Sequence, residues 1–391
     1  MRILLLHNRY QIAGGEDTVV HAEKGLLESR GHEVFLLEAD NQQIAGWTAR
    51  VRAAVGAVYS RSSRRLVAKE IARFRPDVMH VHNFFPLFSP SIYSAACEAG
   101  VAIVQTLHNY RLVCPNALFF RDGHACEDCL GKSVAWPGIV HACYRRSRLA
   151  TVPVAAMLAV HRARGTWTDM VDDYIALTEF ARQKMVEGGL PPGKVTVKPN
   201  FVHPSPVVGN GEGGYALFVG RLSEEKGVST LLAAWKQLAR EIPLKIVGDG
   251  PLAGIVKSAT KESQGVEWLG HVPREQVADL MRSAALLILP SICYEGFPMS
   301  IVEAFSVGLP VVASNLGAMS FLIRHEHTGL HFRAGDADNL AAQVRWARSN
   351  PLRLQQMRQA ARGEFEAKYT AECNYKMLIH TYENAIERTP R

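Results

Sequence analysis

Long apolar runs are missing from this 391-residue sequence. No stretch reaches the roughly 18–20 residues that a membrane-spanning helix needs, and the apolar start at residues 3–6 is too short for a signal peptide. We therefore expect a cytoplasmic protein. Its hydrophobic content of 48% and charged content of 21% are typical of a soluble globular protein. The length is typical of about two domains.

Cysteine is scarce as well. Seven cysteines, an odd number in a long chain, argue against a disulfide framework. Four of them fall within the segment 114–143: Cys114, Cys126, Cys129 and Cys143. A C-x-x-C pair with two flanking cysteines has the ligand count of a structural zinc site. The outer spacings are not those of a standard zinc ribbon, so free thiols and a redox or disulfide role stay open. His124 and His141 are substitute ligands.

Acidic residues are outnumbered by basic residues in the first half of the chain. The net charge is +7, and residues 1–205 carry 24 Lys and Arg against 18 Asp and Glu, a net of +6. Within residues 44–75, apolar residues recur at helical spacing and Glu70 is the only acid among many arginines. This pattern fits a helix that lies on an anionic membrane. An ordinary helix with its apolar face in the core and its arginines solvated fits it slightly better. Nucleic acid is not expected as a partner, because no aromatic residues alternate with the arginines.

Several nucleotide-binding signatures are absent. The sequence has no G-x-G-x-x-G followed by an acid some twenty residues later, which weakens a nicotinamide interpretation. It has no Walker lysine loop, no aspartate cluster suited to magnesium, and no clear lysine for pyridoxal phosphate.

Strands and helices alternate through both halves of the sequence, which predicts an α/β protein with two doubly wound domains. We expect a first domain over residues 1–204, with an excursion at 114–143, and a linker over 205–214. A second domain is expected over residues 215–370. The last helix, 371–391, can cross back to the first domain.

The most informative stretch is residues 295–303, which follows a buried apolar strand and precedes a short helix. Pro298 suits the first turn of that helix. The N–H groups of Met299, Ser300 and Ile301 would then be free to bind phosphate. Glu295 lies on the loop, and Glu303 is placed to accept hydrogen bonds from a ribose diol.

Other candidate ligand-binding residues also follow strands. Arg221 ends one strand and Lys226 comes five residues later, so both can reach a diphosphate; a surface pair bridged by Glu224 or Glu225 is the alternative. In the first half, His108 ends a strand, where ligands bind in open α/β sheets. A glycine pair, Gly14 and Gly15, permits close backbone approach.

These motifs together resemble the retaining, nucleotide-sugar-dependent glycosyltransferases of family 4 (group 1), which have the GT-B fold of two Rossmann-like domains facing a central cleft. The most specific similarity lies at residues 218–227, 247–251 and 295–303. Gly14–Gly15, His108 and the Pro199–Asn200 pair add to it. The segment 114–143 is not part of the general family pattern.

The resemblance implies a role for each candidate residue. The implied catalytic residues are His108, Glu295, Arg221 and Lys226. The implied donor-binding residues are Gly14, Gly15, Arg221, Lys226, Gly248, Val272, Glu295, Gly296, Phe297, Pro298, Met299, Ser300, Ile301 and Glu303. Arg221 and Lys226 would bind the diphosphate, Glu303 the ribose, Glu295 and His108 the sugar, and Val272 would lie near the base.

We therefore expect a retaining hexosyltransferase that uses a UDP- or GDP-hexose and needs no cofactor for catalysis. Its acceptor would be a glycan or a lipid-linked glycan in cell-surface polysaccharide or glycolipid assembly, with peripheral attachment to the inner face of the membrane through residues 44–75. A nucleotide-sugar epimerase of the same fold and a non-catalytic binding protein remain alternatives.

Overall fold

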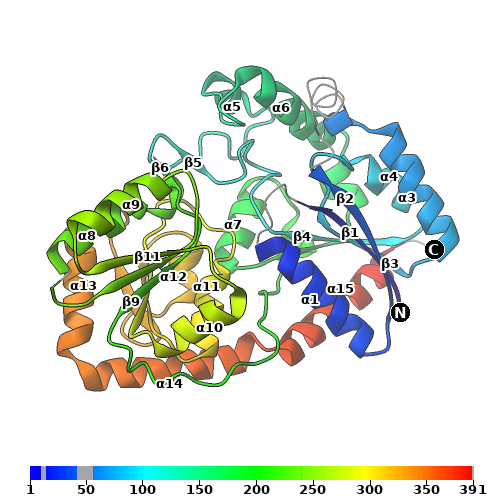
Figure 1. Ribbon diagram of the computed structural model, residues 1–391. Coiled ribbons are helices and arrows are strands. Elements are labelled where there is room, and N and C mark those ends of the chain that lie inside the picture. The colour runs from blue at the N-terminus through cyan, green and yellow to red at the C-terminus, as the bar shows by residue number, and fades with distance from the viewer. Residues whose placement is uncertain (10–14, 42–55, 239, 390–391) are drawn as a thin grey trace. The chain divides into compact units, whose positions relative to one another are not determined.

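A computed structural model describes residues 1–9, 15–41, 56–238 and 240–389. Contacts divide the chain into two compact units. The first comprises Met1–Phe119, Glu127–Asn200 and Asn374–Arg391, and the second comprises Phe120–Cys126 and Phe201–Cys373. The predicted α/β class with two parallel sheets is confirmed, and Figure 1 shows the elements of both.

Within its described residues, the first unit is built on a six-stranded parallel sheet of order β2-β1-β3-β4-β7-β8. Its strands are β1 (Arg2–Arg9), β2 (Glu33–Asp40), β3 (Val78–Asn83), β4 (Ala102–Leu107), β7 (Asp173–Ala176) and β8 (Val195–Val197). Its helices and helical turns are α1 (Gly15–Ser29), α3 (Arg61–Phe74), α4 (Ser91–Glu98), α5 (Trp136–Val140), α6 (Arg148–Ala163), η2 (Thr166–Met170), α7 (Glu179–Glu187), η3 (Pro192–Lys194) and most of α15 (Ala371–Arg388).

The central strands of this sheet read as unbroken apolar runs because both of their faces are covered. Ile3, Leu4, Leu5 and Leu6 of β1 are fully buried. All six residues of β3 and of β4 are buried as well, including the histidines of β3. Polar side chains in these strands must therefore find partners inside the protein.

The second unit carries a six-stranded parallel sheet of order β11-β10-β9-β12-β13-β14, again counted over the residues described. Its strands are β9 (Ala216–Val219), β10 (Leu244–Val247), β11 (Val266–Gly270), β12 (Leu286–Leu289), β13 (Val311–Ser314) and β14 (Gly329–Phe332), with the small hairpin β5 (Phe120–Arg121) and β6 (His124–Ala125). Its helices and turns are η4 (Glu224–Lys226), α8 (Val228–Leu238), α9 (Ala253–Glu262), α10 (Arg274–Ser283), α11 (Met299–Ser306), α12 (Ala318–Leu322), α13 (Ala337–Ser349) and α14 (Pro351–Lys368).

Both large sheets reverse their direction of growth at one place. In the first unit the chain goes from β1 to β2 on one side and then to β3 on the other; in the second it goes from β9 to β10 and β11 and then returns to β12. The loops that leave the two strands on either side of such a reversal diverge, and ligands bind between them at the carboxyl ends of the strands. A ligand is therefore expected at the sheet reversal of each unit.

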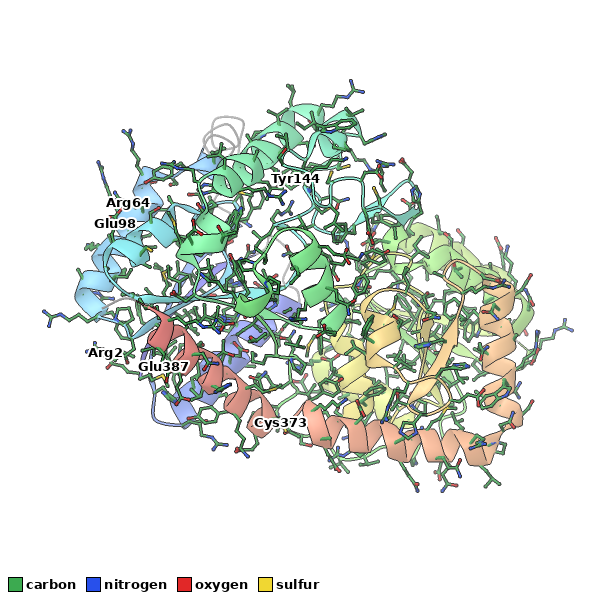
Figure 2. All side chains as sticks on the ribbon, turned by 180° about the vertical axis from the view of Figure 1, so that it is seen from behind. Arg2, Arg64, Glu98, Tyr144, Cys373 and Glu387 are labelled. Atoms are coloured by element: carbon green, nitrogen blue, oxygen red, sulfur yellow. The ribbon has the colours of Figure 1, made fainter. Side chains whose placement is uncertain are left out.

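The basic segment 44–75 is only partly described, since residues 42–55 lie outside the described ranges. In its described part, α3 turns Val67 and Ile71 into the core and leaves Arg61 and Arg65 exposed. Arg64 and Glu98 of α4 point toward one another and form an ion pair at 2.5 Å (Figure 2). None of the described helices combines the length and the apolar character that crossing a bilayer demands.

Candidate active site

The second unit gathers its candidate residues on the two loops at its sheet reversal. The loop after β9 carries Arg221 and leads into η4, which ends at Lys226. The loop after β12 carries Glu295 and leads into α11. Because β9 and β12 are hydrogen-bonded neighbours, side chains that are far apart in the sequence meet here.

Glycine is required where the loops after β9 and β10 touch. Gly248 has a φ of 132°, in the region that side chains rarely adopt, and a Cβ there would lie 1.9 Å from the carbonyl oxygen of Gly220. The Leu222 N–H donates to the Asp249 carbonyl at 2.9 Å and ties the same two loops together. Gly248 therefore fixes the backbone on which Arg221 stands.

Lys226 is held by Glu295. Its Nζ donates to both carboxylate oxygens, at 2.6 and 2.9 Å, and the Ser291 hydroxyl donates to Oε1 of the same carboxylate at 2.6 Å. Burial would lower the pKa of Lys226, but the charge of Glu295 outweighs it and the pKa is raised. Lys226 is therefore a fixed cation, and its partner is Glu295 rather than the Glu224 or Glu225 considered as alternatives.

Arg221 is different. It is exposed, and its side chain makes no hydrogen bond or ion pair to any of the residues that the structure describes. A guanidinium offers five N–H donors in a planar fork suited to phosphate oxygens. Arg221 is thus an available cation on the same loop system as the fixed cation Lys226.

The helix after Glu295 begins slightly later than the sequence suggested. Pro298 is the N-cap of α11 rather than a residue of its first turn, because its ψ of 101° is extended and not helical. The Ile301 N–H is also used, donating to the Pro298 carbonyl at 3.0 Å. The expectation of three free N–H groups is therefore wrong for Ile301, and Met299 and Ser300 remain as the candidate donors at this helix start.

Glu303 lies on α11 and is largely enclosed. Burial raises the pKa of its carboxyl, an effect that the guanidinium of Arg274 at 3.6 Å partly offsets. Phe297 and Val272 are half-buried and pack against the apolar core beneath the loop. Gly296 lies between Glu295 and Phe297 on the same half-buried stretch.

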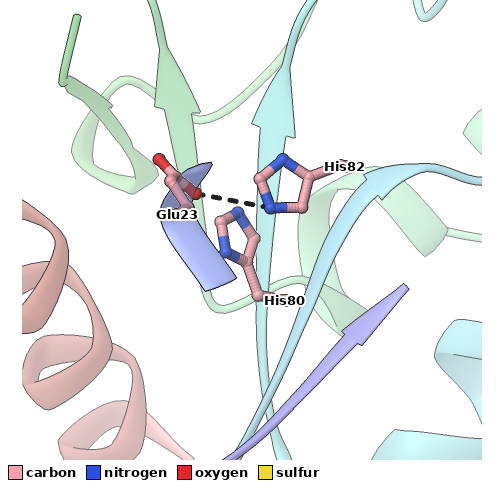
Figure 3. A group of neighbouring side chains, drawn as sticks. All are labelled: Glu23, His80 and His82. Atoms are coloured by element: carbon pink, nitrogen blue, oxygen red, sulfur yellow. Dashed lines mark ion pairs between the residues drawn. The ribbon is translucent and has the colours of Figure 1, made fainter. Parts of the chain in front are cut away.

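The sheet reversal of the first unit holds a buried cluster of charged and imidazole side chains. Glu23 of α1 and Lys198, which follows β8, form an ion pair at 2.5 Å, and both side chains are almost completely buried. Figure 3 shows Glu23 facing His82, with 3.4 Å between its Oε2 and the ring Nε2. Nearby, His7 of β1 donates from Nε2 to Asp17 at 2.7 Å.

His108, the histidine singled out in the sequence, is attached to this cluster. Its Nε2 lies 2.9 Å from Nδ1 of His82, and the two rings are stacked. His80, beside His82, contacts the hydroxyls of Tyr382 at 2.7 Å and Thr106 at 2.8 Å. The two strand-end histidines of β3 thus serve to connect His108 with Glu23 and to anchor α15.

Burial keeps these histidines neutral at physiological pH. It lowers the pKa of His108 to about 3 and the pKa values of His80 and His82 well below the usual value. Burial would raise the pKa of Glu23, but the Lys198 ammonium outweighs it, so that pKa is lowered. The cluster is therefore one ion pair surrounded by neutral imidazoles.

Charge and hydrogen bonding favour one placement of the proton on His82 and on His108. The Glu23 carboxylate faces Nε2 of His82 at 3.4 Å without a hydrogen bond, and its negative charge favours a proton on that nitrogen. Nδ1 of His82 then accepts, and the proton of His108 lies on Nε2. His108 is left with a lone pair on Nδ1, an acceptor for a ligand hydroxyl.

Glu23, His80 and His82 also bring three potential metal-ligand atoms within 4.8 Å of one another. These residues do not suit a cation. Both nitrogens of His80 already contact hydroxyls, and the Lys198 ammonium occupies an oxygen of Glu23. A positive charge next to an ammonium in a buried site is strongly unfavourable.

The chain matches two family models. Residues 13–205 match the model described as Glycosyltransferase Family 4, and residues 206–364 match the model described as Glycosyl transferases group 1. The chain belongs to the group 1, family 4 glycosyltransferases. The resemblance inferred from the sequence motifs is therefore confirmed.

Relatives of this family 4 chain differ in how much they share with it. The putative teichuronic acid biosynthesis glycosyltransferase TuaC of Bacillus subtilis is 31% identical over 44% of this chain, a match that covers only 42% of TuaC. The phosphatidyl-myo-inositol mannosyltransferase of Mycolicibacterium smegmatis is 26% identical over 85% of this chain and 81% of its own length. The match to TuaC thus spans less than half of the length of that protein.

Among solved structures, Anabaena Alr3699/HepE in complex with UDP superimposes with a TM-score of 0.67 at 17% identity, covering 98% of this chain and 100% of that one. At this identity the likeness shows the fold alone. The GT-B fold expected from the sequence is confirmed.

The four cysteines of segment 114–143 are not brought together. Cys114, Cys129 and Cys143 belong to the first unit, but among the described residues no three cysteine sulfurs lie within 4.8 Å of one another. The Cys114 thiol is buried and donates to the Asn116 side chain at 2.9 Å. The structure therefore does not support the predicted zinc site, which stays a prediction.

The glycine pair is described only in part. Gly14 lies outside the described residues, and Gly15 is the first residue of α1. Glu16 and Asp17 follow it in the first turn, so acidic side chains accompany this helix start.

Proposed function

We propose that this family 4 chain is a retaining glycosyltransferase that moves a hexose from a nucleoside-diphosphate sugar to a glycan or lipid-linked acceptor. The observation that carries the proposal is the presence of an available cation, Arg221, and a fixed one, Lys226, on the connection after β9 at a sheet reversal. Two cations in this place suit the two phosphates of a diphosphate. Support also comes from the family, and from the UDP in the complex of Alr3699/HepE.

The donor is proposed to lie along the loops of the second unit. Arg221 and Lys226 hold the diphosphate, aided by the backbone N–H groups of Met299 and Ser300. Glu303 accepts the two ribose hydroxyls. Val272 packs against the base, and Gly248 lets the backbone lie close to the donor. Gly296, Phe297 and Pro298 shape the loop.

The Lys226–Glu295 pair gives the donor site a way to respond to its ligand. Without a ligand, the carboxylate neutralises the ammonium. When a diphosphate offers its oxygens to Lys226, Glu295 is released toward the hydroxyls of the sugar and keeps its hydrogen bond from Ser291. The charge on Lys226 is thus compensated both before and after binding, which keeps its desolvation cost low.

His108 is proposed to accept a hydrogen bond from a sugar hydroxyl through its Nδ1. The charge of Glu23 near His82 and the hydrogen bond between His82 and His108 favour this tautomer. The low pKa of His108 keeps the lone pair unprotonated at neutral pH. Gly15, with Gly14, is proposed to supply backbone contacts near the acceptor.

In the proposed reaction, the bond between the anomeric carbon and the diphosphate oxygen breaks through an oxocarbenium-like state. The acceptor hydroxyl forms a bond to the same face of the anomeric carbon, and its proton passes to an oxygen of the departing diphosphate. Arg221 and Lys226 stabilise the charge that develops on the leaving group. Neither a cofactor nor a zinc ion takes part.

A nucleotide panel read by thermal shift tests the proposal. UDP or GDP should raise the melting temperature, since a ligand that binds the folded state stabilises it. Arg221→Ala should remove most of the increase, because a hydrogen bond to a charged group contributes about 1.5–3 kcal/mol, which corresponds to roughly 10–150-fold in affinity.

Arg345→Ala is the matched control, since Arg345 is also an exposed arginine of the second unit. Equal stabilisation of the wild type and Arg221→Ala by every nucleotide would contradict the proposal. Release of nucleoside diphosphate only when an acceptor is added separates a transferase from an epimerase and from a non-catalytic binding protein.

A further inference from the structure

Helix α6 is apolar on both of its faces. Its inner face buries Val154, Met157 and Leu158 in the first unit. Its outer face presents Leu149, Val152 and Val160 to solvent, and Leu149 is 86% exposed. A helix that is apolar all round is normally covered on every side. Among the described residues, nothing therefore covers the outer face of α6, although its apolar composition favours a covered face.

The exposed apolar surface continues beyond α6. The short helix α5 packs beside it, and the Arg148 Nε–H donates to the Val140 carbonyl at the end of α5. Trp136 of α5 is 56% exposed, and Val134 and Val140 are exposed as well. We name the exposed residues of these two helices and the segment before them the α5–α6 surface: Val134, Trp136, Val140, Leu149, Val152 and Val160.

Charges around the α5–α6 surface are mostly positive, and the exposed Asp169 beside Gly165 is an exception. The sequence contains no Asp or Glu from residue 129 to residue 168. Exposed cations lie close to the apolar residues in the chain: Lys132, Arg145, Arg146, Arg148 and Arg164. At the edge near Gly131, the acids Glu127 and Glu187 are both paired with Lys184.

This combination favours a lipid surface as the occupant. Apolar side chains at the level of the headgroups gain by leaving water, tryptophan prefers that level, and nearby lysines and arginines attract anionic lipid. A second copy of the chain would bring two sets of unpaired cations together, which opposes association.

We infer that the α5–α6 surface docks this protein onto an anionic bilayer, with Trp136 and Leu149 inserted and the flanking arginines on the headgroups. The inference deepens the proposed function, on which it rests for a lipid-linked acceptor. It also places the contact on a different element from α3, whose apolar side is buried in the core and whose outer side carries charge.

Vesicle co-sedimentation tests the inference with the full chain. The probes are vesicles of phosphatidylcholine with phosphatidylglycerol, and vesicles of phosphatidylcholine alone. The wild type should bind the anionic vesicles more tightly, and less so at high salt. Leu149→Glu with Val152→Glu should weaken this binding by roughly tenfold or more, since it replaces inserted apolar groups with charge.

Leu352→Glu provides the matched control, since Leu352 of α14 is also a strongly exposed leucine, at 76%. It should leave vesicle binding unchanged. The triple change Arg61→Glu, Arg64→Glu and Arg65→Glu on α3 should weaken binding less than the α6 change does.

The readouts keep this inference separate from the proposed function. The stabilisation by UDP or GDP should be the same in wild type and in the α6 variant, because the nucleotide site lies in the second unit. Unchanged vesicle binding by the α6 variant would overturn the inference. The inference would also be overturned if sedimentation velocity showed that the wild type is a dimer and that the α6 variant is a monomer. If neither UDP nor GDP stabilised the wild type, that result would contradict the proposed function alone.

Discussion

The two units place charged side chains at the same point of equivalent sheets but enclose them differently. In the first unit, Glu23 and Lys198 are buried together and surrounded by neutral histidines. In the second, Lys226 is paired but partly open, and Arg221 stands exposed. A buried charge must be compensated by the protein itself, whereas an open one can be compensated by a ligand. The first cluster should therefore matter most for stability and the second for binding.

The largest effect is expected for Lys198→Met. It leaves the Glu23 carboxylate buried without its cation, which costs about 3–5 kcal/mol of unfolding free energy. Urea unfolding followed by circular dichroism measures the loss. Lys236→Met, at an exposed lysine, is the control and should change little. Adding Glu23→Gln to Lys198→Met should recover part of the stability. A loss below about 1 kcal/mol would mean that this pair is not the buried anchor described here.

A smaller effect is expected for Lys226→Met in the half-open cluster. Glu295 keeps its hydrogen bond from Ser291 but loses two from Lys226, and an acceptor left short of donors costs about 1–3 kcal/mol. The same unfolding measurement applies. Lys245→Met, which removes a loose surface pair with Glu267 at 3.9 Å and a cation–π contact with Tyr215 at 4.4 Å, should cost less. Equal losses for the two variants would contradict the role given to Lys226.

The buried histidines predict a pH dependence that belongs to the first unit. His108 has a pKa of about 3 when folded and about 6.5 when unfolded. The unfolded chain therefore binds more protons as the pH falls below about 6.5, and stability declines toward acid by about 1.4 kcal/mol per pH unit for each such histidine. Unfolding free energies between neutral pH and mildly acidic pH measure this slope. His80→Gln should make the slope shallower, and an unchanged slope would remove His80 from the titrating set.

The smallest change in stability is expected for Arg221→Ala. An exposed side chain without a partner among the described residues contributes within about 0.5 kcal/mol. The variant should therefore unfold like the wild type while it loses its response to nucleoside diphosphate. If Arg221→Ala lowered stability as much as Lys226→Met, the contrast between exposed and paired cations would fail.

Much of the fold could be predicted because local patterns decide it. The apolar runs at residues 3–6, 101–107 and 286–289 are strands of parallel sheets, and the glycine and charged residues after them mark the loops that carry the candidate site. Arg221, Lys226 and Glu295 were found in this way, from their positions after strands and from the family pattern.

The partners of these residues could not be predicted, because they come from distant parts of the chain. Lys198 meets Glu23 across 175 positions, and Lys226 meets Glu295 across 69. Nothing local indicates such pairings. Pro298 was placed one residue too far into its helix because proline is favoured at the first helical position. The apolar outer face of α6 was missed because helical periodicity cannot tell which of two apolar faces is covered.

The return of α15 to the first unit has a consequence for how the protein is made. The Tyr382 hydroxyl contacts His80, and Asn374 donates to the carbonyl of Pro199, so α15 packs against the unit that the first strands begin. During synthesis the ribosome must make the entire second unit before it makes this helix. The N-terminal half must therefore wait, with one side of its buried histidines uncovered, and nascent chains should depend on chaperones until translation ends.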